Sequence, residues 1–531
     1  PDERAAWRDR APEDGPLAGL TFAIKDNLDL AGVPTTVACP DLAGRPATRT
    51  ATAVRRLVDA GAVPVGKTNL DQFATGLVGT RSPYGACHSV ADPARVSGGS
   101  SSGSAVAVAS GLVPLALGTD TAGSGRVPAA FNGIVGIKPT RGLVSAHGVF
   151  PACRSLDCVT TFTRTVTEGR RALDVLAAPD DADPYSRAFP PRPPVGVAER
   201  MRVIGVPAGP LDLADDHRAA WEQAVKHAGQ IGRLVPVDVS AFLEAAGLLY
   251  QGPWVAERYA AFGDLLDGPG VDPTVRSVVA PGARISGADT FTGLHRLAGF
   301  ARATAPVWDA IDALLLPVTP GHPTLAEVAA DPVGVNARLG AYTNFVNLLD
   351  LCAVAVPAGH RPDGLPFGVQ LIAPAFADRP LLDLAARWCG EPAPAEPVSP
   401  GFAVVAVVGA HLTGQPLNPQ LLALGARLHR RAHTAGGYRL YRLPGPGPAR
   451  PGLVRTGDGP ADGFPVEVWR LTHQALGALL EAIPAPLALG TVELDDGTGV
   501  PGFLAEEHAV RGAADISASG GWRAHLAAPL G

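Results

Sequence analysis

The chain has 531 residues, of which 46% are hydrophobic and 18% are charged, a composition that favours a large packed interior and excludes a disordered chain. The formal net charge of -6 is unlike that of a basic nucleic-acid-binding protein. The sequence also contains no run of 18 apolar residues that would span a membrane, so neither a nucleic acid nor a membrane is expected as a partner.

The first 390 residues alternate between strand-like and helix-like patterns. This alternation predicts an α/β fold with a mixed central sheet covered by helices. The chain begins at Pro1 without a methionine, which is typical of a fragment. Strands are predicted at 20–30, 63–68, 313–317, 351–356 and 367–373, and helices at 50–60, after Gly103, near 215–230 and at 296–314.

The composition changes at GEPAPAEPVSPG (390–401), which is rich in proline and poor in apolar side chains. Such a stretch is typical of an interdomain linker. FAVVAVVGA (402–410) then begins a segment whose turn-rich alternation predicts mostly β structure. We therefore expect a first domain over 1–390, a linker over 391–401 and a second domain over 402–531.

Two motifs match known ligand-binding patterns in an unsuitable context. GAVPVGKT (61–68) has the P-loop spacing, but a predicted helix precedes it and a strand follows, which is the reverse of a phosphate-binding loop. HRRAH (429–433) has two histidines at i and i+4, but no third ligand, and a solvated helix face is expected instead.

The six cysteines show no metal-site spacing and predict free thiols in a reducing compartment. No metal or cofactor is expected.

Two stretches of small residues contain serines: SGGSSSGS (97–104) and DTAGSGR (120–126). GSSSG matches the nucleophile elbow of α/β-hydrolases and nominates Ser101, with His322 or His360 as the base. However, that elbow follows a buried strand, whereas SVADPARVSG precedes this one.

The alternative is a pair of facing Gly/Ser loops, in which one serine attacks and the other relays its proton to a base. Backbone N–H groups of such loops come close to a ligand and can hold an oxyanion. Lys25, at the end of an apolar strand, is the candidate base. A lysine that is neutral at pH 7 needs a pKa about 3.4 below its ordinary value, which corresponds to about 4.6 kcal/mol and requires a dry site.

Three segments, IKDN (24–27), SGGSSSGSAVAVASG (97–111) and GTDTAGSGRVPAAFNGIVGIKPTRG (118–142), closely resemble the motifs of the amidase signature family, in the family's order. The resemblance implies that Ser124 is the acylated serine, Ser100 the bridging serine in a cis peptide, and Lys25 the base. It also implies an oxyanion hole built by the N–H groups of Thr121, Ala122, Gly123 and Ser124.

Within that family the chain looks most like the allophanate hydrolases. That resemblance implies hydrolysis of allophanate, a small anionic substrate, with Tyr250 and Arg258 binding its carboxylate. It also implies that His411, in a γ-glutamyl cyclotransferase-like second domain, assists decarboxylation of N-carboxycarbamate. A cytoplasmic homodimer is expected, linked in function to urea carboxylase or to enzymes of cyanuric acid and biuret degradation. The segments that carry this resemblance lie at 66–86, 151–159, 250–259, 342–359, 407–418 and 519–526.

Several alternatives stay open at this point. The chain can be another amidase of the same family or one chain of an amidotransferase, with a second domain that only forms dimers. Arg258 is one of forty arginines and can belong to a surface ion pair, and His411 can be structural.

Overall fold

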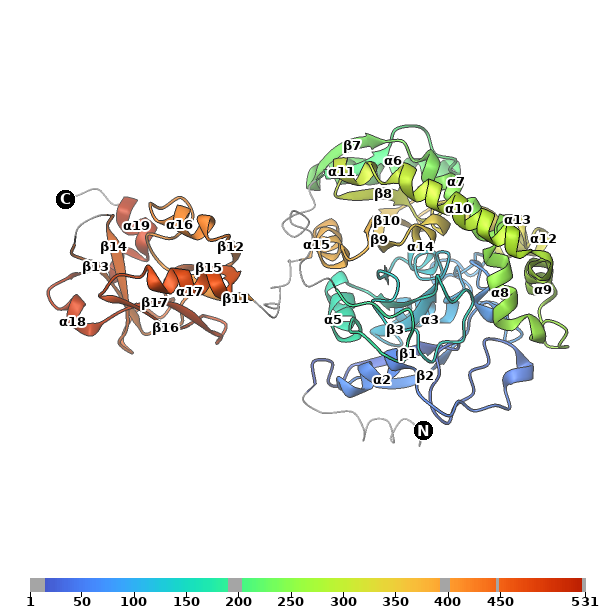
Figure 1. The fold of residues 1–531 in the computed structure, drawn as a ribbon, viewed down its shortest axis with the longest axis horizontal. Helices are drawn as coiled ribbons and strands as arrows, with labels where there is room; N and C mark the ends of the chain where they lie inside the picture. The colour runs from blue at the N-terminus through green and yellow to red at the C-terminus, as the bar shows by residue number, and fades with distance from the viewer. Residues whose placement is uncertain (1–14, 190–202, 392–401, 446–447, 528–531) are drawn as a thin grey trace. The chain divides into compact units, whose positions relative to one another are not determined.

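The computed structural model describes residues 15–189, 203–391, 402–445 and 448–527. It divides into two compact units, Pro1–Ala393 and Pro394–Gly531, called here the N-terminal and C-terminal units (Figure 1). Of the predicted linker over 391–401, all but Glu391 lies outside the described residues. No helix in the described ranges is long and apolar enough to cross a membrane.

The N-terminal unit is built on a ten-stranded mixed sheet, which confirms the predicted fold class. The strand order is β2-β1-β3-β5-β4-β9-β10-β8-β6-β7. Strand β1 pairs in parallel with β2 and β3, and β6 pairs in parallel with β7 and β8. The neighbours in the middle of the sheet, from β3 through β5, β4, β9 and β10 to β8, pair antiparallel. The strands are β1 (Thr21–Lys25), β2 (Val63–Thr68), β3 (Leu115–Asp120), β4 (Val135–Lys138), β5 (Cys158–Thr163), β6 (Val203–Pro207), β7 (Arg233–Val237), β8 (Ala313–Pro317), β9 (Leu351–His360) and β10 (Pro366–Pro374).

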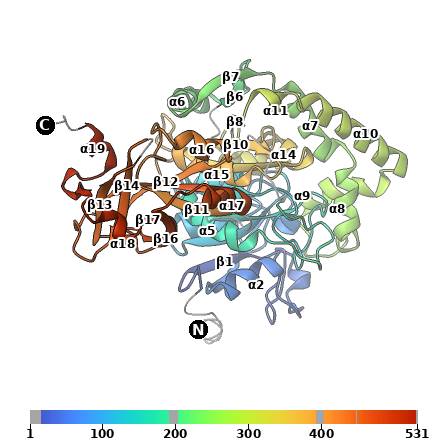
Figure 2. The same cartoon turned by 60° about the vertical axis from the view of Figure 1, so that its left-hand side comes forward.

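Helices pack on the sheet in two groups. Helices α2, α5, α15 and α6 contact one another in series, and α7 contacts α8, α10 and α14. Figure 2 shows α7, α8, α10 and α14 on the right-hand side of the view. The helices of this unit are α2 (Thr52–Asp59), α3 (Ser102–Ala109), α4 (Val127–Phe131), α5 (Val166–Leu176), α6 (Asp215–Ile231), α7 (Ser240–Gln251), α8 (Trp254–Phe262), α9 (Pro273–Val279), α10 (Gly287–Thr304), α11 (Val307–Ala310), α12 (Leu325–Ala330), α13 (Gly334–Leu339), α14 (Asn344–Leu348) and α15 (Asp378–Trp388).

Strand β1 shows how the sheet separates the core from the site. Phe22 and Ile24 lie in the large apolar cluster beneath α2, α5 and α15, whereas Ala23 lies in a second cluster with residues of α3 and α4. Because side chains alternate along a strand, Lys25 shares the face of Ala23. The side chain of Lys25 therefore lies on the face of the sheet that α3 and α4 cover.

The predicted helix over 296–314 was wrong at both ends. Helix α10 begins at Gly287, where Ser286 and Asp289 form a reciprocal capping box, and it ends at Thr304. Pro306 precedes the short helix α11, and β8 begins at Ala313. The apolar spacing was correct, but the capping residues and the proline set the boundaries.

The C-terminal unit is mostly β, as predicted. A five-stranded sheet has the order β12-β15-β11-β17-β16, and a three-stranded sheet has the order β14-β13-β18. Its elements are β11 (Phe402–Val407), α16 (Asn418–Ala423), β12 (Arg427–His433), β13 (Tyr438–Leu443), β14 (Arg450–Arg455), β15 (Pro465–Thr472), α17 (His473–Glu481), β16 (Leu487–Glu493), β17 (Gly499–Ala505), α18 (Glu507–Val510), β18 (Ala514–Asp515) and α19 (Trp522–Ala527).

Candidate active site

Lys25 lies at the carboxyl end of β1 and is fully buried. Its Nζ lies 2.7 Å from Ser100 Oγ and 2.8 Å from Thr119 Oγ1. Thr119 is near the end of the parallel strand β3 and also accepts a hydrogen bond from Asn27 Nδ2. Parallel strands end at the same edge of a sheet, which is why Thr119, 94 positions away from Lys25, meets it here. Ser100 reaches the same edge from the loop that precedes α3.

Burial controls the charge of this lysine. It lowers the pKa of Lys25 to about 7, although the negative charges of Asp71, Asp157 and Asp120 oppose that effect. A substantial fraction of the amine is therefore neutral near neutral pH. A neutral amine at hydrogen-bonding distance from a hydroxyl can accept its proton, so Lys25 and Ser100 form a base–hydroxyl pair.

Ser100 is held in a loop that only small residues can form. The Gly99–Ser100 peptide is cis, as the family resemblance implied. A Cβ on Gly99 would lie 2.0 Å from Asp71 Oδ2. The Asp71 carboxylate in turn accepts hydrogen bonds from the N–H groups of Val78, Gly79 and Arg81. The loop of small residues thus wraps a buried carboxylate.

Ser124 lies in the second loop, whose shape depends on a buried ion pair. Asp120 and Arg126 are both fully buried, with Arg126 Nε 2.9 Å from Asp120 Oδ2. The carboxylate also accepts the N–H groups of Gly123 and Gly125 at 2.8 and 3.0 Å. Burial alone would raise the pKa of Asp120, but the charge and hydrogen bonds of Arg126 lower it overall. Gly123 and Gly125 of loop 121–125 are therefore both tied to the carboxylate of Asp120.

Of the four N–H groups predicted to form the oxyanion hole, one is already engaged in a hydrogen bond. The N–H of Gly123 donates to Asp120, whereas those of Thr121, Ala122 and Ser124 donate to no described residue. Gly123 has φ of 132°, and a Cβ there would lie 2.4 Å from Thr343 Oγ1, so glycine is required. In the described part of the chain the Ser124 hydroxyl makes no hydrogen bond to Ser100, and its side chain is almost fully buried. Three amides and one hydroxyl are thus left for a ligand.

Ser101, the alternative nucleophile, is engaged elsewhere. Its hydroxyl donates to Thr119 O at 3.0 Å and accepts from Thr119 N at 3.3 Å. Of the two histidines proposed as the base for Ser101, one contacts a backbone carbonyl and the other is exposed at the surface. His322 Nε2 lies 2.8 Å from Val96 O, and His360 is exposed at the end of β9. These contacts give Ser101 a structural role.

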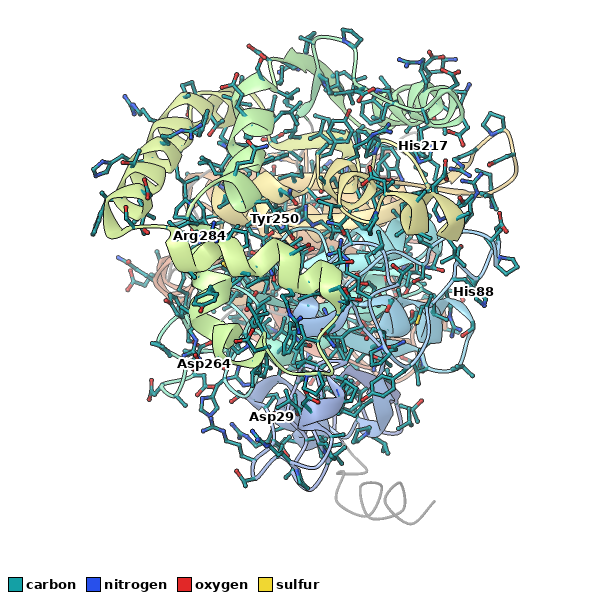
Figure 3. All side chains as sticks on the ribbon, turned by 90° about the vertical axis from the view of Figure 1, so that its right-hand side faces the viewer. Asp29, His88, His217, Tyr250, Asp264 and Arg284 are labelled. Carbon is teal, nitrogen blue, oxygen red and sulfur yellow. The ribbon has the colours of Figure 1, made fainter. Side chains whose placement is uncertain are left out.

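Arg258 on α8 and Tyr250 on α7 form a pair (Figure 3 labels Tyr250). The guanidinium carbon of Arg258 lies 5.3 Å from the centroid of the Tyr250 ring. Arg258 is fully buried, its Nη1 donates to Thr75 Oγ1 at 3.2 Å, and its Nε has no partner. Burial alone would lower the pKa of Arg258, but Tyr250, Cys153, Asp157 and Glu257 raise it overall. The arginine is a buried cation without an ion-pair partner among the described residues.

Asp157 connects the Arg258–Tyr250 pair to the loop that carries Ser124. It accepts hydrogen bonds from Thr121 Oγ1 at 2.5 Å and from the N–H groups of Ala152 and Cys153. Burial raises its pKa to about 6, against the hydrogen bond from Thr121 and the charge of Arg258. Asp157 also lines a cavity of about 410 Å³. Ala122 packs in one apolar cluster with Trp254 and Tyr250, so the loop of Ser124 and the arginine pair are neighbours.

His411 lies in the C-terminal unit and lines a cavity of about 190 Å³. Its Nε2 lies 3.2 Å from Gln420 Oε1, and its ring stacks on Phe503 with centroids 5.2 Å apart. Burial, together with the charge of Arg450, lowers the pKa of His411.

The remaining motifs have structural roles. GAVPVGKT forms a helix-to-strand connection as expected, and Lys67 Nζ contacts Asp26 Oδ1 at 2.9 Å. The prediction of a helix face at HRRAH was wrong: these residues form strand β12, because they pair with β15. Within the described ranges no cluster of three or more His, Cys, Asp or Glu can hold a metal, and all six cysteines are free.

Several residues of the site were not singled out from the sequence. Asp120 and Arg126 flank Ser124 within DTAGSGR, and Asp157 lies within the PACRSLDCV segment. Charged residues inside runs of small or apolar residues were the available signal, since such charges are buried only when paired. Thr119, Asn27 and Thr75 carried no comparable signal.

The chain resembles known proteins over nearly its full length. Residues 2–382 match the family model described as amidase, and residues 403–527 match the model of the allophanate hydrolase C-terminal domain. The chain is 41% identical to the urea amidolyase of Saccharomyces cerevisiae over 96% of its own length, and it spans only 30% of that relative. It is 38% identical to a component of the glutamyl-tRNA(Gln) amidotransferase of Symbiobacterium thermophilum, covering 70% of this chain and 83% of the relative.

A solved structure also resembles this chain over nearly its full length. The allophanate hydrolase of Kluyveromyces lactis matches with a TM-score of 0.78 and 40% identity, covering 99% of this chain and 91% of that one.

The buried ion pair makes a stability prediction. We expect Arg126→Met and Asp120→Asn each to lower the free energy of unfolding of the N-terminal unit by about 3–5 kcal/mol, because each leaves a buried partner without its counterion. Urea unfolding measures the loss. The matched control is Arg55→Met, which removes an exposed pair with Asp59 and should change stability by about 0.5 kcal/mol or less. Equal effects at the two sites would contradict the prediction.

Proposed function

Because the chain belongs to the amidase family and carries an allophanate hydrolase C-terminal domain, we propose that it is an allophanate hydrolase that releases ammonia through Ser124, Ser100 and Lys25. The observation that supports this most directly is the buried Lys25–Ser100 pair beside a loop with three unused N–H groups. The proposed chemistry needs no metal or cofactor.

In the proposed mechanism Ser124 Oγ attacks the ureido carbonyl carbon of allophanate. Its proton passes to Ser100, whose own proton passes to the neutral Lys25 amine. The N–H groups of Thr121, Ala122 and Ser124 stabilise the tetrahedral oxyanion. When the C–N bond breaks, the nitrogen takes a proton back along the same relay and leaves as ammonia. Water then cleaves the acyl-enzyme and yields N-carboxycarbamate.

Arg258 and Tyr250 are proposed to bind the carboxylate of the substrate. A buried guanidinium without a carboxylate partner is costly, and an anionic ligand would offset that cost. Arginine also binds carboxylates in a planar, bidentate geometry. The closeness of this pair to Asp157 and the 121–124 loop supports a substrate that spans both.

The C-terminal unit is proposed to accelerate decarboxylation of N-carboxycarbamate through His411. The C–N bond breaks, its electron pair stays on nitrogen, and that nitrogen takes a proton from His411 to give carbamate and carbon dioxide. The supporting observation is that His411 lines a small, mostly apolar cavity.

The likeness to urea amidolyases also suggests a biological setting. A functional link to urea carboxylase is proposed, because that chemistry supplies allophanate, and the homodimer and a cytoplasmic location belong to the same proposal. Hydrolysis of cyanuric acid or biuret is the alternative source.

Ammonia release should depend on the protonation of Lys25. We expect kcat/KM for allophanate to rise about tenfold per pH unit below about 7 and to level off above it, because only the neutral amine accepts a proton. Lys25→Ala should abolish the activity, whereas Lys226→Ala, at an exposed lysine, should keep the profile. Asp157→Asn removes a charge that raises the pKa of Lys25, so it should move the rise to lower pH. A flat profile between pH 6 and 8 would rule Lys25 out as the base.

Arg258 should determine the preference for a carboxylate. We expect Arg258→Gln to reduce kcat/KM for allophanate by about 2–5 kcal/mol, mainly through KM, while hydrolysis of the uncharged analogue malonamide changes far less. Arg284→Gln, at an exposed arginine, is the matched control. Ser124→Ala gives the background rate. Equal losses on both substrates would assign Arg258 a structural role.

The role of His411 can be tested in the full chain. His411→Asn should leave ammonia release unchanged and slow the release of carbon dioxide, because N-carboxycarbamate then decays only spontaneously. Stopped-flow measurement of both products after one mixing step separates the two rates. If the variant and the parent release carbon dioxide at the same rate, the C-terminal unit has no part in the chemistry, and a dimer-forming role is the better explanation.

A further inference from the structure

Thr343 lies at the start of α14, directly beside the loop that carries Ser124. It is fully buried, and its hydroxyl donates to the carbonyl oxygen of Ala122 at 2.6 Å. A threonine at the N-cap of a helix usually accepts a hydrogen bond from the N–H group of the second or third helical residue. Thr343 occupies the N-cap of α14, but its side chain makes no such bond. The hydroxyl therefore serves the neighbouring loop and not its own helix.

Arg126 joins α14 to the same loop. The guanidinium that pairs with Asp120 also donates from Nη2 to Thr343 O at 3.1 Å and to Asn347 Oδ1 at 3.2 Å. Asn347, one turn further along α14, donates from Nδ2 to Asp120 O at 2.8 Å. All four residues are fully buried. The position of Thr343 beside the loop is therefore fixed by contacts that do not involve its hydroxyl.

Two peptide groups of the loop are held by their carbonyl oxygens. Asp120 O accepts from α14, and Gly123 O accepts from the N–H groups of residues 126 and 127 at 2.8 Å each. In a planar trans peptide the C=O and the N–H that follows it point in opposite directions. Holding these two carbonyls therefore fixes the directions of the N–H groups of Thr121 and Ser124.

The peptide between Thr121 and Ala122 is held differently. In the part of the chain that the structure describes, its carbonyl accepts no hydrogen bond and its N–H donates none. Its orientation therefore depends on the peptides on either side. The peptide that follows is held at both ends, because Ala122 O accepts from Thr343 and the Gly123 N–H donates to the Asp120 carboxylate. Gly123 has φ of 132° and a wide choice of backbone angles, so hydrogen bonds must restrict this peptide.

We propose that Thr343 is a positioning residue for the oxyanion hole: its hydroxyl holds the Ala122 carbonyl and thereby directs the N–H of Ala122 toward the oxyanion. This role rests on the proposed attack by Ser124. Without the hydroxyl, Ala122 O becomes a buried acceptor without a partner, and it gains one only if the peptide turns. Turning would move the adjoining N–H groups away from the place where negative charge develops. Such donors act chiefly in the transition state, so the loss should fall on kcat and not on KM.

The experiment compares four side chains at position 343 in the full chain: the parental threonine, Thr343→Val, Thr343→Ser and Thr343→Ala. Valine keeps the shape of threonine without the hydroxyl, whereas serine keeps the hydroxyl without the methyl group. We expect kcat for ammonia release from allophanate to fall by about tenfold or more in the valine and alanine variants, and by no more than about threefold in the serine variant. KM should stay near the parental value in all four chains. The pH profile should keep its rise near pH 7, because Lys25 and its contacts are unchanged.

Thr304→Val is the matched control. Thr304 is also buried, and its hydroxyl also donates to a backbone carbonyl, that of Phe300 within α10. This variant should keep the parental kcat, and urea unfolding of every variant separates a loss of stability from a loss of rate. If the valine variant fails to fold, the serine and alanine variants still differ by a single hydroxyl and carry the comparison.

A parental kcat in the valine variant together with a low kcat in the serine variant would assign position 343 a packing role and overturn the inference. Equal kcat in all four chains would also overturn it. Ser124→Ala separates this failure from that of the proposed function. If Ser124→Ala still releases ammonia, the proposed nucleophile and the role of Thr343 fall together. If it is inactive while the hydroxyl at position 343 has no effect, only the role of Thr343 falls.

Discussion

The desolvation of Lys25 is the constraint on which the rest of the N-terminal unit depends. A fully buried amine loses the hydration that keeps it protonated, and three buried or nearly buried carboxylates, Asp71, Asp157 and Asp120, oppose that loss through their charge. Each of these carboxylates accepts hydrogen bonds from backbone N–H groups, and Asp120 also pairs with Arg126. The balance leaves Lys25 near neutrality beside Ser100, where a base of moderate strength is most effective.

The small residues of the two Gly/Ser loops are needed because the buried carboxylates must be covered by backbone N–H groups. Carboxylates that are neutralised by backbone N–H groups need chain segments that come very close to them, and a Cβ on Gly99 would collide with Asp71. Gly123 similarly lets the second loop turn between Asp120 and Thr343. The two Gly/Ser stretches are therefore wrapped around buried acids, and Ser100, in the first of them, lies beside Lys25. Among the described residues, the N–H groups of Thr121, Ala122 and Ser124 and the Nε of Arg258 have no hydrogen-bond partner.

Much of the fold and part of the site could be predicted from the sequence, for identifiable physical reasons. Alternating apolar patterns predicted β1, β2 and β8, and the small-residue loops predicted where the chain bends around a ligand. The meeting of Lys25 with Thr119 could not be predicted, because it depends on the pairing of β1 with β3, which no local pattern encodes. HRRAH was misassigned because its charged residues fit a helix face and an edge strand equally well, and only pairing with β15 decides between them. Asp157 was not predicted as a site residue, because it interacts with Thr121 and Arg258, which are remote in sequence.

Each unit places an arginine in a characteristic setting. In the N-terminal unit the buried cation Arg258 lies near polar donors, an arrangement suited to fixing a carboxylate while a neighbouring carbonyl reacts. In the C-terminal unit Arg450 and His411 line a cavity whose walls are mainly apolar. The product proposed for the first reaction carries one more negative charge than its substrate. A buried site that binds a monoanion gains little by holding a dianion, since the second charge must be desolvated without a second cation. That difference favours release of the product from the first site.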